Sequence, residues 1–257
     1  MASSLDTLLQ RFDPITLEEM SAIRLMNRID TKFVTTQAKL RALLDMASSH
    51  YYVQQMGQHR LFAYDPTYFD TPGFDMFYTH QRGHVGRQKL RFRTYVESDL
   101  QFMEVKTKNN HGRTKKKRME VTDMLLGDET KRDFLAKHLR YEQSTLHPTL
   151  RSRFRRITLV NKAKTERLTI DVDLCFDNLV TGQHRMLDDL VVVELKRDGL
   201  TQSPVLDMLR SLRIHPHGFS KNCMGSAMTN QALQLNRFKP KIIEIGKIVE
   251  QPLRAFA

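Results

Sequence analysis

The 257-residue sequence has no tryptophan and only two cysteines, Cys175 and Cys223. The cysteines lie far apart and outside any CxxC spacing, which is unlike a disulfide-rich secreted protein. No basic-then-apolar leader is visible, and the most apolar stretch, 190–195, is too short to cross a bilayer. The loops GxxxxGK(S/T) and GxGxxG are absent, which excludes the standard nucleotide-binding folds. We therefore expect a cytoplasmic protein with reduced thiols.

Acidic residues are too few to balance the basic ones, because 29 Asp and Glu face 41 Lys and Arg and leave a net charge of +12. This excess predicts attraction to a polyanion: nucleic acid, an acidic membrane or a phosphate compound. No nucleic-acid-binding motif is recognisable, so we expect no specific nucleic-acid partner. The basic run 113–118 is expected to be a solvated hairpin arm, or else a contact for an emerging polyanion.

No repeat, low-complexity tract or linker divides the sequence. We expect one main domain at 28–235, preceded by an N-terminal helical segment at 1–27 and followed by a C-terminal tail at 236–257. Helical spacing and a capping box that starts at Thr16 predict helices at 16–26, 37–46, 129–140, 204–212 and 221–235. Alternating patterns predict strands at 31–35, 51–55, 59–63, 88–97, 101–108, 115–122, 153–160, 167–176 and 190–197. Many strands without a βαβ rhythm indicate an α+β fold with an antiparallel sheet or barrel.

Several strands alternate charged and apolar side chains. In 89–95, Lys89, Arg91 and Arg93 share one face while Leu90 and Phe92 share the other. The segments 102–108, 167–174 and 191–196 repeat this pattern, and parity places Asp171 and Asp173 together. An ordinary sheet with one solvated face would show the same alternation. However, like charges repeated along one strand repel unless an anion neutralises them, which favours a closed barrel with the charged face inside and helices on the apolar outside.

Eight short segments occur in the order typical of one family: 28–33 (RIDTKF), 68–71 (YFDT), 89–95 (KLRFRTY), 104–108 (EVKTK), 154–156 (FRR), 167–171 (RLTID), 193–196 (VELK) and 219–221 (FSK). This set, from about residue 24 to 226, resembles the polyphosphate polymerase domain of the vacuolar transporter chaperone complex (the VTC domain). That family belongs to the triphosphate tunnel metalloenzymes. The resemblance implies a closed antiparallel eight-stranded β-barrel with flanking helices, whose tunnel binds a nucleoside triphosphate and a growing phosphate chain.

The resemblance also implies roles for individual residues. Phosphate ligands would be Lys32, Arg91, Arg93, Lys106, Arg156, Arg167 and Lys221, and strand parity adds Lys89, Lys108 and Lys196. Of these, Arg91, Arg93, Lys106 and Lys221 are the expected catalytic residues. Glu194 would hold Mn²⁺ or Mg²⁺, with Glu104 as a second metal candidate from parity. At 154–156, Arg155 and Arg156 both remain candidates for the inward position.

The implied activity is metal-dependent transfer of a phosphoryl group from a nucleoside triphosphate, ATP first, to inorganic polyphosphate. Such a transfer needs alignment and charge neutralisation, which Arg forks, Lys charges and a metal supply. A phosphate chain end is already ionised, whereas a hydrolase must position water, with Glu104, Asp171 or Asp173 as the available groups. The first strand lacks the Glu-x-Glu-x-Lys signature of tunnel phosphatases and cyclases, which favours the polymerase branch.

Other functions stay open at this point. They are triphosphate hydrolysis, nucleotide cyclisation and non-catalytic polyanion binding. No partner-sensing helical domain or membrane anchor is recognised in the sequence. We therefore expect a separate membrane protein as partner and a position peripheral to the inner face of a membrane. The oligomeric state is left open.

Overall fold

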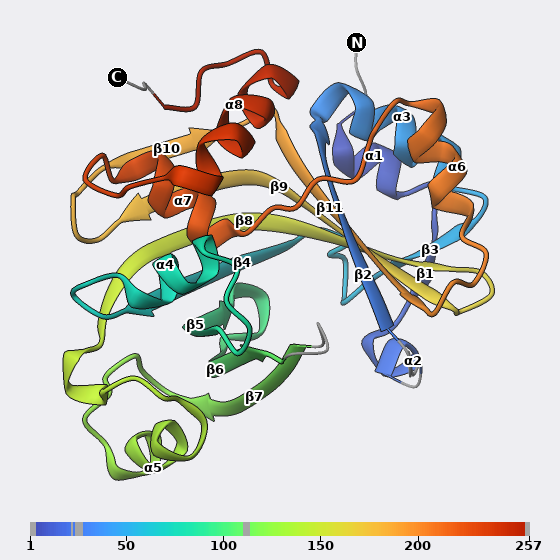
Figure 1. Cartoon of the computed structure of the whole chain (residues 1–257). Coiled ribbons are helices and arrows are strands. Elements are labelled where there is room, and N and C mark those ends of the chain that lie inside the picture. The colour runs from blue at the N-terminus through green and yellow to red at the C-terminus, as the bar shows by residue number, and fades with distance from the viewer. Residues whose placement is uncertain (1–3, 22, 24–27, 110–113, 255–257) are drawn as a thin grey trace.

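The computed structural model describes residues 4–21, 23, 28–109 and 114–254. One 11-stranded sheet dominates it (Figure 1). Its strands are β1 (Asp13–Ile15), β2 (Arg28–Thr36), β3 (Tyr51–Gln54), β4 (Phe62–Asp70), β5 (Gln88–Tyr95), β6 (Leu100–Lys108), β7 (Thr114–Val121), β8 (His147–Asn161), β9 (Glu166–Asn178), β10 (His184–Leu187) and β11 (Leu190–Asp198). The main path runs β2-β11-β9-β8-β4-β5-β6-β7 with antiparallel neighbours, and β3 and β10 add to β8 and β9.

The sheet is open, so the predicted closed barrel is wrong. Its path ends at β2 and β7, and no ladder joins these two strands in the part of the chain that is described. The free edge of β2 is already used, since Phe33 forms a bridge with Pro216 and the His217 amide donates to the Lys32 carbonyl over 2.8 Å. At the other end, β7 exposes a row of lysines, which disfavours the addition of another strand. The predicted α+β class with an antiparallel sheet and flanking helices is confirmed.

The helices cover the apolar faces of the sheet. They are α1 (Leu5–Leu9), α2 (Leu17–Ser21), α3 (Gln37–Ala47), α4 (Asp75–Gln81), α5 (Glu129–His138), α6 (Pro204–Ser211), α7 (Lys221–Thr229) and α8 (Lys239–Ile248). On the outer face, α1, α3 and α6 pack on β2, β11 and β9, where Leu40 and Leu44 belong to the same core as Val191 and Val193 (Figure 1). Leu135 of α5 packs in a separate core with the apolar side chains of β5 and β6. None of the helices in the described ranges is long and apolar enough to span a bilayer.

A second set of helices lies on the opposite, concave side. Helices α4, α7 and α8 share a core with Val192, Leu174 and Phe176. Val192 alternates with Val191 and Val193 along β11, so it faces the side opposite to α3. The segment expected as a C-terminal tail supplies α8, whose Ile242 and Ile245 are buried in this core. The concave face is therefore covered at one end and polar elsewhere.

Local signals predicted some boundaries well and others poorly. The capping box is confirmed, because Glu19 Oε2 accepts from the Thr16 amide over 2.9 Å and Thr16 Oγ1 accepts from the Glu19 amide over 3.2 Å. Strand β4 spans 62–70 rather than the predicted 59–63. Helix α7 ends at Thr229 rather than at 235. The end of the helix predicted at 16–26, and the start of the basic run 113–118, lie outside the described residues.

Gly225 allows α7 to pack directly against the sheet. A Cβ at this position would lie 2.5 Å from Phe176 Cδ1 and 2.7 Å from Leu150 Cδ2. Gly225→Ala should therefore lower the free energy of unfolding by about 1–3 kcal/mol, the usual cost of overpacking a core. Urea denaturation would measure it, with Gly127→Ala as control because nothing lies within 4 Å of that Cβ. Equal stability of the two variants would contradict this packing.

Candidate functional site

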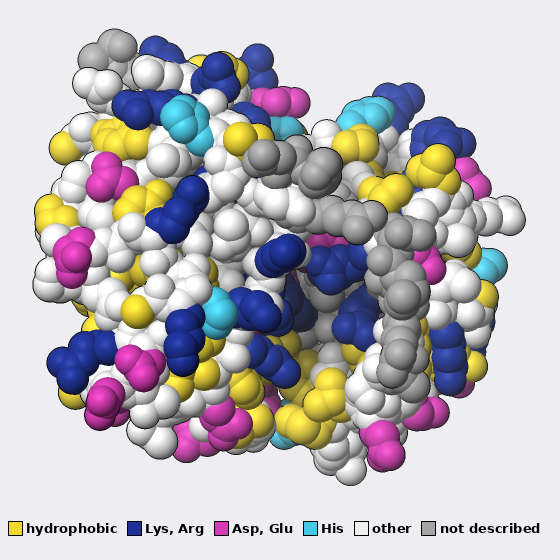
Figure 2. Space-filling view, turned by 60° about the horizontal axis from the view of Figure 1, so that its bottom comes forward, with side chains coloured by type: hydrophobic (Ala, Val, Ile, Leu, Met, Phe, Trp, Pro, Cys, Tyr) yellow, Lys and Arg dark blue, Asp and Glu magenta, His cyan; other side chains and the backbone are white. Residues whose placement is uncertain are grey.

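The polar concave face of the sheet gathers basic side chains from most of its strands. Figure 2 shows Lys and Arg side chains crowded into a hollow of the molecule. The strand registers place Lys32 beside Glu194, Arg156 beside Asp171 and Arg91 beside Glu104, and cross-strand neighbours share a face. We call this surface the groove; its predicted basic residues are Lys32, Lys89, Arg91, Arg93, Lys106, Arg156, Lys196 and, from the start of α7, Lys221.

The first ion-pair cluster of the groove surrounds Glu104 on β6. This carboxylate is fully buried. Arg91 Nε donates to Glu104 Oε2 over 2.7 Å, Arg93 Nη2 pairs with Oε1, and Lys116 Nζ lies 3.6 Å from Oε1. Burial alone would raise the pKa of Glu104, but the guanidinium groups of Arg91 and Arg93 hold it well below its usual range. Both arginine side chains are thereby fixed in orientation beneath the groove.

The second cluster is built on Asp171 of β9. Arg156 donates to both carboxylate oxygens, Nε to Oδ1 over 2.6 Å and Nη2 to Oδ2 over 2.8 Å, and Lys221 Nζ pairs with Oδ2. The Arg156 guanidinium also lies 4.9 Å from the Tyr64 ring centroid, and Lys221 Nζ lies 4.2 Å from that of Phe154. A helix terminus and two strands thus meet at one carboxylate.

The choice between Arg155 and Arg156 is settled by a bulge in β9. Residues 153 and 155 of β8 pair with 175 and 172 of β9, so β9 carries one extra residue at this point. The extra residue is Asp173, whose φ is +54°. Arg156 therefore faces the groove, whereas Arg155 pairs with Asp173 at the exposed outer face. The expectation that Asp173 shares a face with Asp171 is wrong, because simple alternation fails at a bulge.

The third cluster joins two lysines to Glu194 of β11. Lys32 and Lys196 bind its two oxygens, and Lys196 Nζ also donates to Thr169 Oγ1 over 3.3 Å. Burial lowers the pKa of Lys32 to about 7, assisted by the charges of Lys196 and Lys221. Burial likewise lowers the pKa of Lys196 to about 7, assisted by Arg156. Lys32 and Lys196 therefore lose their protons at a lower pH than a free lysine does, and an added anion would favour their charged forms.

The free energy of unfolding should depend on pH because of Lys32 and Lys196. Between pH 7 and about 10 the unfolded chain keeps lysine protons that the folded chain has lost, so the free energy of unfolding should rise with pH. Urea denaturation across this range would measure the slope. A double variant, Lys32→Met with Lys196→Met, should show a flatter profile. Identical slopes for both proteins would contradict the lowered pKa values.

The remaining predicted residues lie toward the edges of the groove. Lys89 Nζ donates to Ser220 Oγ over 2.7 Å and so links β5 to the start of α7. Lys106 pairs in register with Lys89, and the nearby Arg91 charge, together with burial, lowers the pKa of Lys106 well below its usual value. Arg167 shares the groove face but donates to the Met20 carbonyl over 2.9 Å. Lys108 lies at the end of β6, beside the 86–88 segment.

Sequence reasoning missed the aromatic and additional basic members of the groove. Arg93 Nη1 donates to the Tyr95 hydroxyl over 2.7 Å, and Arg91 lies 3.5 Å from the Tyr68 hydroxyl. Tyr95 could have been found, because it has the same strand parity as Arg91 and Arg93. Lys116 could not, because the basic run around it offers no contrast between faces.

Comparison with known proteins supports this fold. No curated protein sequence matches the chain significantly. Two solved structures share its fold: a candidate adenylate cyclase from Bacillus halodurans (14% identity, TM-score 0.50, 76% of this chain and 96% of that chain) and a candidate adenylyl cyclase from Hippeastrum with a dominant triphosphatase activity (14%, 0.51, 80% and 99%). The model of the VTC domain family matches residues 27–230. The resemblance inferred from the sequence is therefore confirmed, and the chain belongs to the VTC domain family.

Proposed function

We propose that the groove binds the triphosphate of a nucleotide, ATP first, and transfers its terminal phosphoryl group to the end of an inorganic polyphosphate chain. The observation that carries this proposal is the row of basic side chains along the concave face. Each of the carboxylates Glu104, Asp171 and Glu194 already binds at least two cations. The groove thus keeps an excess of positive charge, which a polyanion would neutralise. Membership of the VTC domain family supports the same substrate class.

Two kinds of cation would have different tasks. Arg91, Arg93 and Arg156 have planar forks that suit non-bridging phosphate oxygens, and Glu104 and Asp171 hold these forks in place. Lys32, Lys89, Lys106, Lys196 and Lys221 would act as point charges along the chain, with Arg167 and Lys108 at its ends. We propose Arg91, Arg93, Lys106 and Lys221 as the groups that stabilise the charge on the transferred phosphoryl.

Glu194 is the carboxylate that best fits Mn²⁺ or Mg²⁺. Its partners are lysines, which bind through single flexible ammonium groups and can move aside, and these metals commonly use one or two carboxylates together with substrate phosphates. Glu104 fits less well, because guanidinium groups occupy both of its oxygens. We therefore propose that Glu104 positions Arg91 and Arg93 instead. The bound cation would neutralise phosphate charge.

The carboxylates of the groove also favour a phosphate acceptor over water. The cations around Glu104 and Asp171 hold the pKa of each carboxyl well below its usual range despite burial. Such groups are weak bases and would activate water poorly. The ionised end of a phosphate chain needs no such activation. Triphosphate hydrolysis, reported for the Hippeastrum structure, is the second candidate.

Incubation of the purified chain with ATP, Mn²⁺ and a short polyphosphate primer tests the proposal. A ladder of longer chains on a phosphate-stained gel is expected. Orthophosphate without chain growth would favour hydrolysis, and a cyclic nucleotide would favour cyclisation. Saturable binding without any product would favour polyanion binding alone. The membrane-protein partner and the position at a membrane stay predictions, which adding anionic vesicles to the same assay would test.

Adjacent arginines provide a matched test of the binding face. Arg156→Gln should weaken binding of inorganic tripolyphosphate by about 1.5–3 kcal/mol, the range for a hydrogen bond to a charged group. Arg155→Gln should leave the affinity unchanged, because Arg155 pairs with Asp173 on the outer face. Isothermal titration calorimetry would measure both. Equal effects of the two substitutions would contradict the assignment of the groove.

A further inference from the structure

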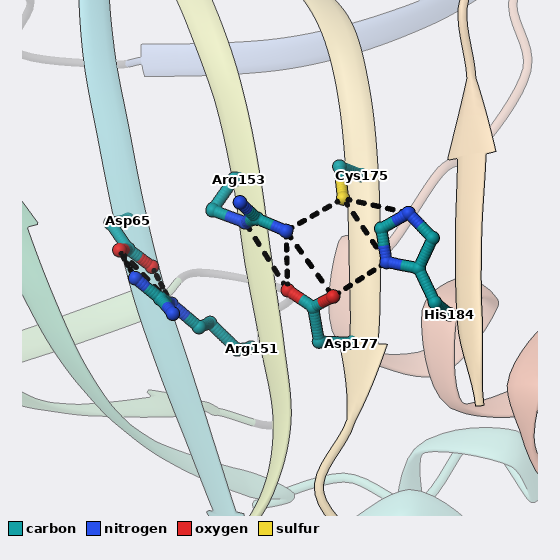
Figure 3. A network of polar contacts seen from close by, with 6 residues as sticks. All are labelled: Asp65, Arg151, Arg153, Cys175, Asp177 and His184. Atoms are coloured by element: carbon teal, nitrogen blue, oxygen red, sulfur yellow. Dashed lines mark hydrogen bonds and ion pairs between the residues drawn. The ribbon is translucent and has the colours of Figure 1, made fainter. Parts of the chain in front are cut away.

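A cysteine, an aspartate and a histidine lie together on the outer face of the sheet, away from the groove. Cys175 and Asp177 alternate along β9, and His184 of β10 lies directly opposite Asp177 in the strand register. One potential ligand atom from each of the three lies within 4.8 Å of the other two. Figure 3 shows these side chains pointing toward one another. Because of the bulge at Asp173, the side chains of Cys175 and Asp177 face outward. The group is therefore separate from the proposed phosphoryl-transfer site.

The three ligand types are those that Zn²⁺ prefers: a thiolate, an imidazole and a carboxylate. Zinc bonds of about 2.0–2.3 Å place tetrahedral ligands about 3.3–3.7 Å apart. His184 Nδ1 lies 3.7 Å from Cys175 Sγ, which already matches. It lies 2.6 Å from Asp177 Oδ1 because these two atoms share a hydrogen bond, so this distance must increase by less than 1.5 Å to admit a metal. The side chains of His184 and Asp177 are 48% and 26% exposed, which leaves room for that adjustment.

Arg153 of β8 now supplies the positive charge at this place. Its Nη2 lies 2.9 Å from Asp177 Oδ2 and 3.2 Å from Cys175 Sγ (Figure 3). The side chain is 47% exposed, so it can turn into solvent without leaving a buried charge behind. The neighbouring Arg151 lies opposite Asp177 in the strand register, but its guanidinium donates to Asp65. Arg153 therefore contacts two of the potential ligands directly, whereas Arg151 is held by a carboxylate outside the group.

We propose that Cys175, Asp177 and His184 form a Zn²⁺ site that clamps β10 to β9, with water as the fourth ligand. On binding, the metal replaces the thiol proton, which passes to solvent, and Arg153 moves away from the ligands. Strand β10 has only four residues, and β9 is its one ladder partner in the described sheet. A bond from each strand to one metal would resist their separation. The site does not depend on the reaction in the groove.

Cobalt provides a direct probe, because it takes zinc sites and reports thiolate ligation by its absorption. We expect one Co²⁺ per full-length chain, a thiolate-to-cobalt charge-transfer band in the near ultraviolet, and displacement of the cobalt by Zn²⁺. Zinc should also raise the midpoint of thermal unfolding, and a chelator should reverse this shift. Cys175→Ser and His184→Ala should abolish the band. Cys223→Ala, which removes the other, fully buried cysteine, should keep it.

The competing arginine sharpens the test. Arg153→Met should bind Co²⁺ at least tenfold more tightly than the natural chain, because the cation that contacts the ligands is gone. Arg151→Met removes a charge that pairs with Asp65 instead and should raise the affinity far less. Absence of the band in the natural chain would overturn the proposal, even if Arg153→Met binds cobalt. A band that survives Cys175→Ser would overturn it as well.

Discussion

Replacing Glu104 by glutamine is expected to lower the free energy of unfolding by about 3–5 kcal/mol, the cost of breaking a buried ion pair from one side. Glu104 is fully buried and binds Arg91 and Arg93, so its neutralisation leaves two poorly exposed guanidinium groups without their partner. Urea denaturation at neutral pH measures the loss. Asp173→Asn is the control, since its pair with Arg155 is half-exposed and should contribute about 1 kcal/mol or less.

Tripolyphosphate should restore part of this stability, because an anion in the groove takes the place of the missing carboxylate. Its stabilising effect on Glu104→Gln should exceed its effect on Asp173→Asn at the same concentration. A loss no larger than that of the control would contradict the view that Glu104 balances the charge of the groove. A large loss without rescue would indicate that phosphate does not reach Arg91 and Arg93.

Glu194→Gln is expected to reduce metal-dependent turnover by about 100-fold or more, since a catalytic cation contributes several kcal/mol to transition-state stabilisation. Binding of tripolyphosphate without metal should persist, because Lys32 and Lys196 lose their competing carboxylate. Product formation with Mn²⁺ and calorimetry without it separate the two effects.

Glu244→Gln, at an exposed position of α8, serves as the control and should retain both properties. Loss of metal-free binding together with turnover would show that Glu194 maintains the groove rather than holding the metal. Full activity of Glu194→Gln would exclude it as a metal ligand.

Alternation along single strands was enough to predict much of the groove. Lys89, Arg91 and Arg93 follow strict parity in β5, and the structure places them on the face opposite to buried Leu90 and Phe92. This works because one face of a strand is buried, which fixes its register strongly. Lys221 followed only from the resemblance. A helix start at 221 was predicted, but nothing in the local sequence indicates that it lies beside Asp171.

The failures came from features that local sequence does not determine. Closure of a barrel depends on what occupies the free strand edges, and here Pro216, far along the chain, pairs with β2. Pro66 lies within β4 at a point that the register with β8 skips, since Tyr64 and Thr67 pair with β8 and Pro66 has no N–H to donate. The face of Asp173 depends on a single extra residue that alternation cannot reveal.

Asp173, the extra residue, shifts the alternation of β9. Every residue of the strand after it faces the side opposite to the one that simple alternation predicts. Asp171, before it, faces the groove, whereas Cys175 and Asp177, after it, face the opposite surface. Removing Asp173 would turn both of these inward and expose Leu174 and Phe176, which now anchor α7. One strand can thus present different polar side chains to the groove and to the outer face, provided that the insertion itself is kept.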